Sequence, residues 1–491
     1  MGTAHLQILC RWSKVCRCWE GMVISMRVLF GNKAFYKRVI MLSLPIMVQN
    51  AITNFVNLLD NIMVGRVGTE AMSGVAIVNQ LAFVFSLVVF GAVSAAGIFG
   101  AQYFGQRNHE GVRYAFRFKL IASALIAIIA GVLFICFGDQ LISLYLHEDG
   151  GAGGDLALTL EYAKTYLSIM LIQMIPFALI QAYAGTLRET GETFVPMLAG
   201  IVAVLVNLVF NYLLIFGKFG FPELGVAGAA IATALSRFVE LAIVVIWTHA
   251  KKERNIFIQG AYKSLYIPGS LVKSILVKGT PLIANEGLWA AGMAVLNQCY
   301  SVRGLSVVGA TNISSTIVNL FNVVFISLGS TVAIIVGQHL GADEKEEAKL
   351  AAYRLITFSV LSCFVVGGVL AACSSLFPQI YNTTDEIRAL ASKFILISAA
   401  FMPMHAFLHA SYFTMRSGGK TIITFLFDSV YIWVASIPLA FCLTRFTDMT
   451  IVPIFFWCSM IDAIKCVLGF ILVKKGVWIQ NITTSLEKEQ E

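Results

Sequence analysis

Hydrophobic residues recur along the chain in long runs separated by short polar segments. Twelve runs are bounded by charged residues or by Gly, Pro and Asn clusters, and each approaches or exceeds the roughly 20 residues that cross a bilayer as a helix. Helices are required, because open sheet edges would leave backbone groups unpaired in lipid. The predicted spans are 39–64, 72–98, 118–137, 160–186, 195–216, 226–248, 273–300, 305–337, 352–377, 393–415, 422–443 and 451–473.

The composition agrees with a polytopic membrane protein. Of 491 residues, 58% are hydrophobic and 13% are charged, and the mean hydropathy is +0.81. Soluble domains have about one quarter charged residues, so soluble enzymes, nucleic-acid modules and secreted disulfide scaffolds fit poorly. The net charge of +8 does not indicate a nucleic-acid partner, because the basic residues lie between the apolar runs.

Lys and Arg are distributed unevenly between the two sets of loops. Of 35 such residues, 26 lie in the termini and the loops on their side, 7 lie in the opposite loops and 2 lie within spans. The positive-inside rule therefore predicts that both termini are cytoplasmic. We expect a plasma-membrane protein with a basic tail at 1–38, a linker at 249–272 and a tail at 474–491; translation from Met26 is an alternative start.

The two halves of the chain are related by an internal repeat. A shift of 236 residues places Gln102 and Gly105 on Gln338 and Gly341, and a shift of 228 aligns LRETGET with MRSGGKT. Each half has six spans, so both halves begin on the same side and the pseudo-twofold axis runs along the membrane normal. The sequence predicts an all-α fold of two six-helix lobes with a cleft between them. The predicted lobes are 39–248 and 273–473.

Ionisable side chains inside the spans need an explanation, because each costs ~2.5 to 3.5 kcal/mol near the bilayer centre on insertion scales. Arg237 and Glu240 are spaced i, i+3, as are Asp462 and Lys465. Residues at this spacing can neutralise each other on one helix face. We interpret both pairs as structural.

Asp60 in NFVNLLDNIMVG has no basic residue within one helical turn. The same helix carries the amides Gln49, Asn50, Asn54, Asn57 and Asn61. The asparagines form a polar stripe that Asp60 borders, which is typical of a helix facing a hydrated cavity. Interhelical hydrogen bonding is the alternative. We favour a functional role for Asp60, because amides suffice for packing and a carboxylate is costlier.

Further candidates lie in the second half. Glu286 in TPLIANEGLWAAGM is unpaired and lies roughly halfway across the bilayer at ~1.5 Å per residue. His405 and His409 in HAFLH are one turn apart, but two His without a nearby carboxylate make a weak metal signal; contact with protons or substrate and plain packing stay open. Asp428 is either a coupling group or a structural partner of His405.

Several segments together make the chain similar to a known family. They are LPIMVQNAITNFVNLLDNIMVGRVG, AQYFGQ, LRETGET, VNLVFNYLLIFGKFGFPELGVAGAAIAT and MRSGGKT. Across about residues 35–480 the chain resembles the multidrug and toxic compound extrusion family, and residues 206–233 are the most specific part. The resemblance implies efflux of cationic, amphipathic compounds in exchange for Na+ or H+.

The resemblance also implies roles for particular residues. Asp60 occupies the place of an acidic residue that takes part in cation coupling, and Glu286 matches an acidic residue of one branch of the family. His405 stands where that branch has a second acidic residue. This departure leaves the coupling ion open, with a slight preference for H+, because a His and a buried carboxylate exchange protons near neutral pH.

These observations predict a cation-coupled antiporter that exports organic cations by alternating access, as a monomer with no cofactor and no nucleic-acid partner. The expected ion-coupling residues are Asp60, Glu286, His405 and Asp428. The expected cavity-lining residues are Gln49, Asn50, Asn54, Asn57, Asn207, Asn312 and His409. The rival is a flippase or exporter of a lipid-linked or other metabolite, which would prefer a cationic cleft. An enzyme is disfavoured, since no HExxH and no paired nucleophile and base occur.

Overall fold

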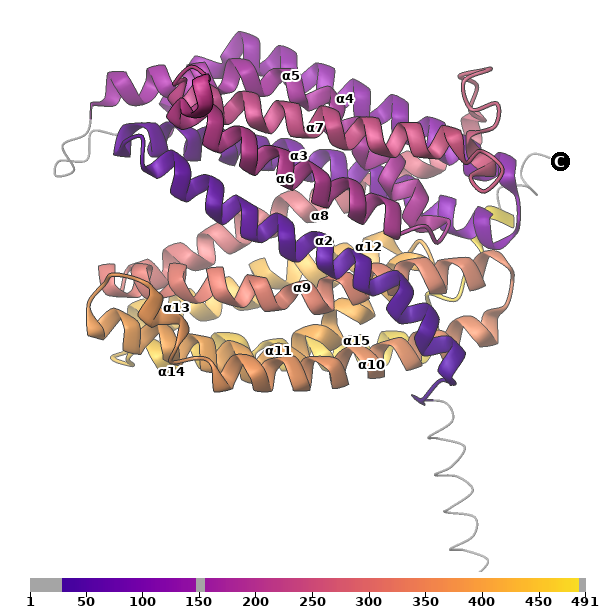
Figure 1. The fold of residues 1–491 in the computed structure, drawn as a ribbon. Helices are drawn as coiled ribbons and strands as arrows, with labels where there is room; N and C mark the ends of the chain where they lie inside the picture. The colour runs from indigo at the N-terminus through magenta and orange to yellow at the C-terminus, as the bar shows by residue number, and fades with distance from the viewer. Residues whose placement is uncertain (1–28, 147–154, 485–491) are drawn as a thin grey trace, which may run out of the picture.

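The computed structural model describes residues 29–146 and 155–484, which form a bundle of long helices (Figure 1). The helices of the first half are α2 Lys33–Gly65, α3 Thr69–Gly105, α4 His109–Ser143, α5 Leu156–Glu189, α6 Phe194–Phe216 and α7 Gly225–Ala250. Those of the second half are α8 Gly269–Ser301, α9 Leu305–Gly341, α10 Lys345–Ala372, α11 Asp385–Ser417, α12 Thr421–Phe425, α13 Ile437–Phe446, α14 Ile451–Met460 and α15 Asp462–Lys475.

Each predicted span coincides with a helix or a helical stretch of the described chain. Eleven stretches are long and apolar enough to cross a membrane, where α12 to α13 and α14 to α15 each count as one. The one predicted span outside these eleven is 273–300, which corresponds to α8. This helix is 33 residues long but carries the charged residues Lys273, Lys278 and Glu286. The prediction of an all-α polytopic membrane protein is therefore confirmed.

Polar caps extend several helices beyond the hydrophobic runs. α4 begins at His109, where the Asn108 side chain accepts a hydrogen bond from Gly111 N at 2.8 Å. α11 begins at Asp385, where Thr384 Oγ1 accepts from Ile387 N at 3.4 Å. Such caps satisfy the first amide groups of a helix. α4 consequently starts 9 residues before the predicted span start at 118, and α11 starts 8 residues before the predicted start at 393.

The helices form two groups (Figure 1). In the first group α3, α4 and α5 pack against one another and α7 packs against α5 and α6; in the second group α9, α10 and α11 pack against one another. The first helix of each half reaches across: α2 contacts α9, and α8 contacts α3. Since α2 corresponds to α8 and α3 to α9, these crossings agree with the predicted pseudo-twofold relation. The residue limits of the two lobes stay a prediction.

The linker between the halves is packed onto the bundle. It contains the short 3-10 helix η2, Ile256–Ile258. Arg117 of α4 donates hydrogen bonds to the carbonyl oxygens of Gly260 at 2.9 Å, Ala261 at 2.7 Å and Tyr266 at 3.0 Å. One guanidinium group therefore fixes the loop by satisfying three of its backbone acceptors.

The segment after α15 also folds back onto the bundle. Trp478 is fully buried, and its Nε1 donates to Val473 O at 3.1 Å. The predicted C-terminal tail is thus packed as far as residue 484. The predicted N-terminal tail is described only from residue 29, so the alternative start at Met26 lies outside the described residues.

Both described ends of the chain lie at one end of the bundle, which we call the terminal end. Arg38 near the start of α2 donates to Gln338 Oε1 at 2.5 Å. Asn481, beyond α15, donates to Gly341 O at 3.0 Å. Both partners belong to the last turn of α9, so the two chain ends meet the same helix end.

Candidate functional site

Asp60 lies in a polar site that we call the N-lobe acid pocket, formed with Asn207, Asn211 and Thr233. Asn211 Nδ2 donates to Asp60 Oδ1 at 2.6 Å. The Asn207 amide fits its neighbours when its nitrogen faces Asp60, 2.9 Å from Oδ1, and its oxygen accepts from Thr233 Oγ1 at 3.2 Å. Both amides are almost fully buried. The carboxylate thus has neutral donors from α6 as partners.

The sequence around residues 206–233 explains how α6 and α7 come together. Gly217 ends α6 in the left-handed conformation with φ 59, and Leu224 N donates back to Leu214 O at 2.8 Å. A Cβ on Gly228 would lie 2.6 Å from Leu214 O. Only a glycine permits that approach, so the loop and the glycine together set the amides of α6 against α7.

The predicted pair of Arg237 and Glu240 is confirmed. Arg237 Nη1 lies 2.7 Å from Glu240 Oε2 on the same face of α7. The Arg237 guanidinium also lies over the Phe177 ring, 5.6 Å from its centroid. This arginine is therefore neutralised within its own helix, and no salt bridge joins a basic side chain to Asp60 among the described residues.

A second ionic site, the C-lobe acid cluster, consists of Asp428, Lys465 and Asn285. Lys465 Nζ lies 2.8 Å from Asp428 Oδ1, and Asn285 Nδ2 donates to Asp428 Oδ2 at 3.2 Å. Ser429 Oγ in turn donates to Asn285 Oδ1 at 2.8 Å. The aspartate is therefore held by a tethered ammonium group and an amide.

One predicted pair is wrong, and the structure does not bear out one of the two alternatives left open for Asp428, a partnership with His405. Lys465 pairs with Asp428 and not with Asp462, and Asp428 has Lys465 as its ionic partner in place of His405. Asp462 instead lies 3.8 Å from His405 Nε2. The helical stretch is interrupted at Ile461, between α14 and α15, so Asp462 stands at a helix start and faces another helix.

Local backbone structure places Asp428. It lies in the π-helical segment η4, Leu426–Val430, which follows α12 and is succeeded by a second such segment, η5, Ile432–Ser436. Tyr431 between them donates to Ile461 O at 2.7 Å. Wider π turns shift the direction of side chains and frequently occur at functional sites. Here they bring Asp428 and the interruption at Ile461 together.

The remaining predicted coupling and histidine positions lie close to this cluster. Glu286 is half-buried on α8, directly after Asn285, and its charged neighbours are Arg416 and Asp428. The His409 ring lies 5.3 Å from both the Phe325 and the Phe413 ring centroids. Those contacts agree with aromatic packing, and the predicted cavity role of His409 stays a prediction.

A cavity of about 130 Å³ lies between the two helix groups. Arg188 from α5 and Arg416 from α11, which correspond under the shift of 228, both line it. Glu189 also lines the cavity and forms a buried salt bridge with Lys119. The charge of Glu189 is thereby cancelled, so the two arginines give the cavity a basic character.

Comparison with known proteins identifies the family. A family model described as MatE matches residues 45–213 and 282–442, more than half of the chain. The chain belongs to the MatE family. Members are membrane transporters and not enzymes, so both the predicted family and the predicted absence of an enzymatic function are confirmed.

Relatives of this MatE transporter cover nearly the whole chain. "Probable multidrug resistance protein NorM" of Thermotoga maritima is 25% identical over 464 residues, covering 93% of the chain and 96% of the relative. "Probable multidrug resistance protein YoeA" of Bacillus subtilis is 23% identical over 416 residues, covering 84% and 87%.

Solved structures share the fold. A MATE crystallised in complex with MaL6 has a TM-score of 0.81 at 19% identity and covers 94% of this chain and 99% of that chain. A MOP superfamily transporter from Pyrococcus furiosus, described with a "reverse polarity of binding pocket" that suggests a different function, has a TM-score of 0.79 at 20% identity and covers 91% and 97%.

The predicted cavity amides of this MatE transporter occupy different environments. Gln49 Oε1 accepts from Arg188 Nη2 at 2.8 Å, and Asn50 Nδ2 donates to Ser327 Oγ of α9 at 3.3 Å. Asn54 and Asn312 are exposed. The side chain of Asn57 lies outside the described residues. Gln49 and Asn50 therefore make interhelical hydrogen bonds, which was the alternative explanation for the polar residues of this helix.

Sequence reasoning missed Lys119, Glu189 and the lining role of the arginines. The predicted spans 160–186 and 393–415 end just before Arg188, Glu189 and Arg416, which were therefore assigned to loops. Lys119, at the start of the predicted span 118–137, was counted with the preceding loop, whereas it is fully buried. The available signal was the repeated segment LRETGET, which carries Arg188 and Glu189 together and recurs around Arg416. Among the described residues, no group of three or more His, Cys, Asp or Glu side chains is arranged to hold a metal ion.

Proposed function

We propose that the protein is a cation-coupled antiporter that exports amphipathic, mostly cationic organic compounds across the plasma membrane by alternating access. The observation that carries this proposal is Asp60, whose partners are neutral amides and which has no salt bridge among the described residues. An ionisable group in a membrane interior that lacks a counter-ion marks an ion or proton pathway. The relatives named multidrug resistance proteins support drug compounds as the cargo.

The orientation of the amides supports H+ over Na+ as the coupling ion. Asn211 presents its amide nitrogen to Asp60, and Asn207 best fits its neighbours when its nitrogen does the same. An amide nitrogen donates hydrogen bonds and has no lone pair for a hard metal cation, which prefers oxygen ligands. A proton, by contrast, needs only the carboxylate itself.

The C-lobe acid cluster supports assigning the coupling role to Asp60. Lys465 neutralises Asp428, and His405 lies near Asp462. Glu286 is half-buried without such a partner and is the second candidate. We assign the terminal end to the cytoplasm, because 26 of the 35 Lys and Arg residues lie in the termini and the loops on that side.

The deciding experiment is ethidium efflux from cells that express wild type, Asp60→Asn or the control Ile62→Ala. Ile62 is exposed on the same helix and lies outside the polar stripe. Efflux is measured under an imposed pH gradient and then under an imposed Na+ gradient. We expect efflux to follow the pH gradient, to disappear in Asp60→Asn and to persist in Ile62→Ala. Absence of ethidium efflux from wild type under both gradients contradicts the proposal.

A second candidate function is export or flipping of an anionic metabolite. The observation in its favour is the pair Arg188 and Arg416 lining the interlobe cavity. Proteoliposomes that contain the protein and a fluorescent anionic lipid discriminate the two functions. This candidate is favoured if the wild-type protein flips the lipid but does not transport ethidium, and if Arg416→Lys no longer flips the lipid.

A further inference from the structure

The last turns of α3 and α9 cross in direct backbone contact at the terminal end. A Cβ on Gly105 would lie 1.9 Å from Gln338 O, and a Cβ on Gly341 would lie 1.9 Å from Gln102 O. These four residues correspond in pairs under the shift of 236. The crossing therefore sits on the pseudo-twofold axis, and only glycine permits it on either side.

Gln102 and Gln338 make reciprocal bonds across this crossing. Gln102 is fully buried, and its Nε2 donates to Ser417 O at 2.9 Å. Gln338 Nε2 donates to Glu189 O at 2.7 Å. Ser417 and Glu189 are equivalent under the shift of 228, so each glutamine binds the helix end of the other half.

The acceptor atoms of the two glutamines are also satisfied from the opposite half. Gln102 Oε1 accepts from Ile482 N at 2.9 Å, and Gln338 Oε1 accepts from Arg38 Nη2 at 2.5 Å. The bonds of Gln102 to Ser417 and Ile482, and the bond of Gln338 to Glu189, therefore join the two helix groups and are lost if the groups separate at this end. Arg38, by contrast, lies where the start of α2 packs against the second group.

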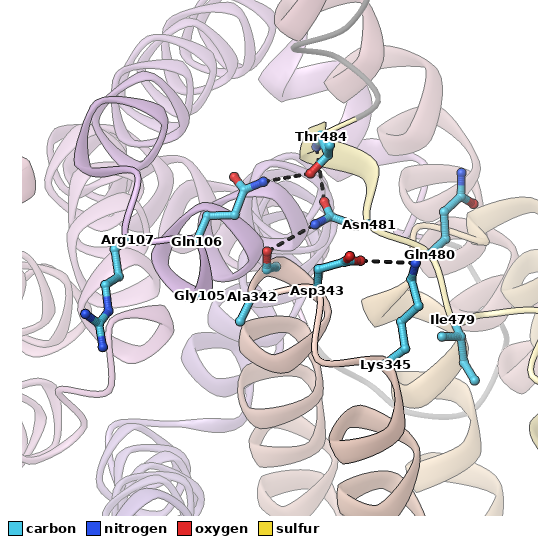
Figure 2. A pocket seen from close by; sticks show the side chains of 11 residues that line it. Gly105, Gln106, Arg107, Ala342, Asp343, Lys345, Ile479, Gln480, Asn481 and Thr484 are labelled. Carbon is cyan, nitrogen blue, oxygen red and sulfur yellow. Dashed lines mark hydrogen bonds and ion pairs between the residues drawn. The ribbon is translucent and has the colours of Figure 1, made fainter.

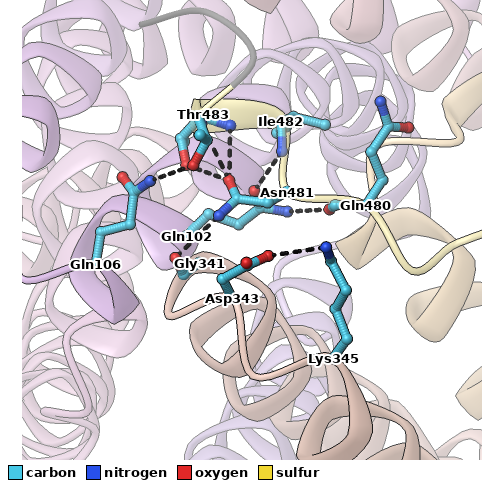
Figure 3. A network of polar contacts seen from close by, with 10 residues as sticks. Gln102, Gln106, Gly341, Asp343, Lys345, Gln480, Asn481, Ile482 and Thr483 are labelled. Atoms are coloured by element: carbon cyan, nitrogen blue, oxygen red, sulfur yellow. Dashed lines mark hydrogen bonds and ion pairs between the residues drawn. The ribbon is translucent and has the colours of Figure 1, made fainter.

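The segment 478–484, which we call the C-terminal strap, lies over the crossing (Figure 3). Asn481 Nδ2 donates to Gly341 O at 3.0 Å, and Gln106 Nε2 of the first half donates to Thr484 Oγ1 at 3.0 Å. Trp478 anchors the strap by packing its backbone directly against Gly418. A Cβ placed on Gly418 would lie 1.7 Å from the Trp478 carbonyl oxygen. The strap belongs to the second half and bonds to the first.

The strap and the two helix ends together line a polar hollow of about 690 Å³ (Figure 2). It is lined by residues 105–107 of the first half, 341–343 and Lys345 of the second, and 479–481 and Thr484 of the strap. Groups released from the crossing can therefore be solvated there, which lowers the cost of leaving buried amides without partners.

We propose that Gln102, Gln338 and the C-terminal strap form a gate that joins the two lobes at the terminal end and opens in each transport cycle. The inference rests on alternating access in the proposed function, in which the lobes rock around a central site. Contacts made in only one of two conformations set the population of that conformation. The gate therefore holds the state that is closed at the terminal end.

The first test replaces a donor of the gate by an acceptor. Gln102→Glu turns the nitrogen that faces Ser417 O and Gln480 O into an oxygen. In a background without the ten native cysteines, we measure labelling of Ser330→Cys in the interlobe cavity by a membrane-impermeant maleimide added at the terminal end. We expect a labelling rate about tenfold higher, equivalent to about 1.4 kcal/mol.

The matched control is Gln259→Glu, in the exposed linker at the same end, where Gln259 bonds only within the linker to Lys252 O at 2.8 Å. An unchanged labelling rate in a folded Gln102→Glu protein overturns the gate. Labelling needs no transported substrate, so this result is independent of whether the protein exports ethidium.

The second test locks the gate. In the same cysteine-free background, Gln106→Cys and Thr484→Cys are joined by a short bis-methanethiosulfonate cross-linker, because Gln106 Nε2 and Thr484 Oγ1 are 3.0 Å apart. Cross-linking is expected to reduce ethidium efflux to background and a reductant to restore it, while each single variant is unaffected by the reagent. Undiminished efflux from fully cross-linked protein overturns the proposal.

Discussion

At the residue scale, the coupling role proposed for Asp60 should depend on the amides that bind it. Removing Asn211 in Asn211→Ala deletes the 2.6 Å hydrogen bond to the carboxylate. A hydrogen bond to a charged group contributes about 1.5 to 3 kcal/mol, so we expect coupled efflux to fall at least about tenfold. Ethidium efflux under a fixed pH gradient measures this, and an undiminished rate contradicts the assigned pocket.

Lys465 and Asp428 lead to a prediction about stability. Lys465→Met leaves the half-buried carboxylate of Asp428 without its ammonium partner, which is buried and 2.8 Å away. Breaking a buried ion pair costs about 3 to 5 kcal/mol, whereas removing both charges is nearly neutral. We expect the melting temperature in detergent to fall in Lys465→Met and to recover in Lys465→Met with Asp428→Asn. Equal losses in both variants contradict a mutual pairing.

These residues show what sequence reasoning resolves in a membrane protein. Asp60 was identifiable because an unpaired carboxylate inside an apolar run is costly. The pairing of Asp462 with Lys465 was wrong because the i, i+3 rule considers one helix only, while Asp428 from another helix lies nearer to Lys465. Partners between helices depend on packing that no local spacing records.

At the element scale, the α6–α7 hairpin positions the N-lobe acid pocket, and Gly228 is its closest point. Gly228→Ala would place a methyl group 2.6 Å from the backbone oxygen of Leu214. Forcing a group into such a contact costs typically about 1 to 3 kcal/mol. We expect a lower melting temperature and weaker efflux, because the amides of α6 are displaced from Asp60.

Gly131→Ala in α4 is the matched control, since no atom lies within 4 Å of a Cβ placed there. Alanine is favoured over glycine in a helix by about 1 kcal/mol, so this variant is expected to be unchanged or slightly more stable. If Gly131→Ala loses as much stability as Gly228→Ala, the effect is due to glycine replacement in general and not to the contact with Leu214.

The helices themselves were predictable, but their ends and attachments were not. Long apolar runs locate each span because the bilayer imposes a minimum length. Polar first turns such as the one capped by Asn108 continue a helix beyond that length. The packing of the C-terminal strap was missed because a short segment has too little periodicity, and the burial of Trp478 depends on helix ends elsewhere.

At the scale of the whole molecule, the two halves share a fold and differ in chemistry. Arg237 and Lys465 correspond under the shift of 228. Arg237 pairs with Glu240 on its own helix, whereas Lys465 pairs with Asp428 on another. The first half consequently keeps Asp60 free of salt bridges among the described residues. In the second half Lys465 neutralises Asp428, and Glu286 has no salt bridge among the described residues.

This asymmetry predicts the coupling ratio. If Asp60 alone carries the driving ion, one proton enters for each singly charged ethidium that leaves, and the exchange moves no net charge. We therefore expect the steady-state ethidium gradient in proteoliposomes to be unchanged when the membrane potential is clamped at different values. Liposomes without protein control for dye leakage.

A second proton per cycle would move one net charge. The potential then contributes ~2.3 kcal/mol per 100 mV, which shifts the steady-state gradient by about fiftyfold per 100 mV. If such a shift occurs, Glu286→Gln tests whether Glu286 is the second carrier, because Glu286 is half-buried and has no salt bridge among the described residues. If the shift is lost in that variant, Glu286 carries the second proton. If the shift persists, Asp428 and Lys465 become the candidates for the second proton.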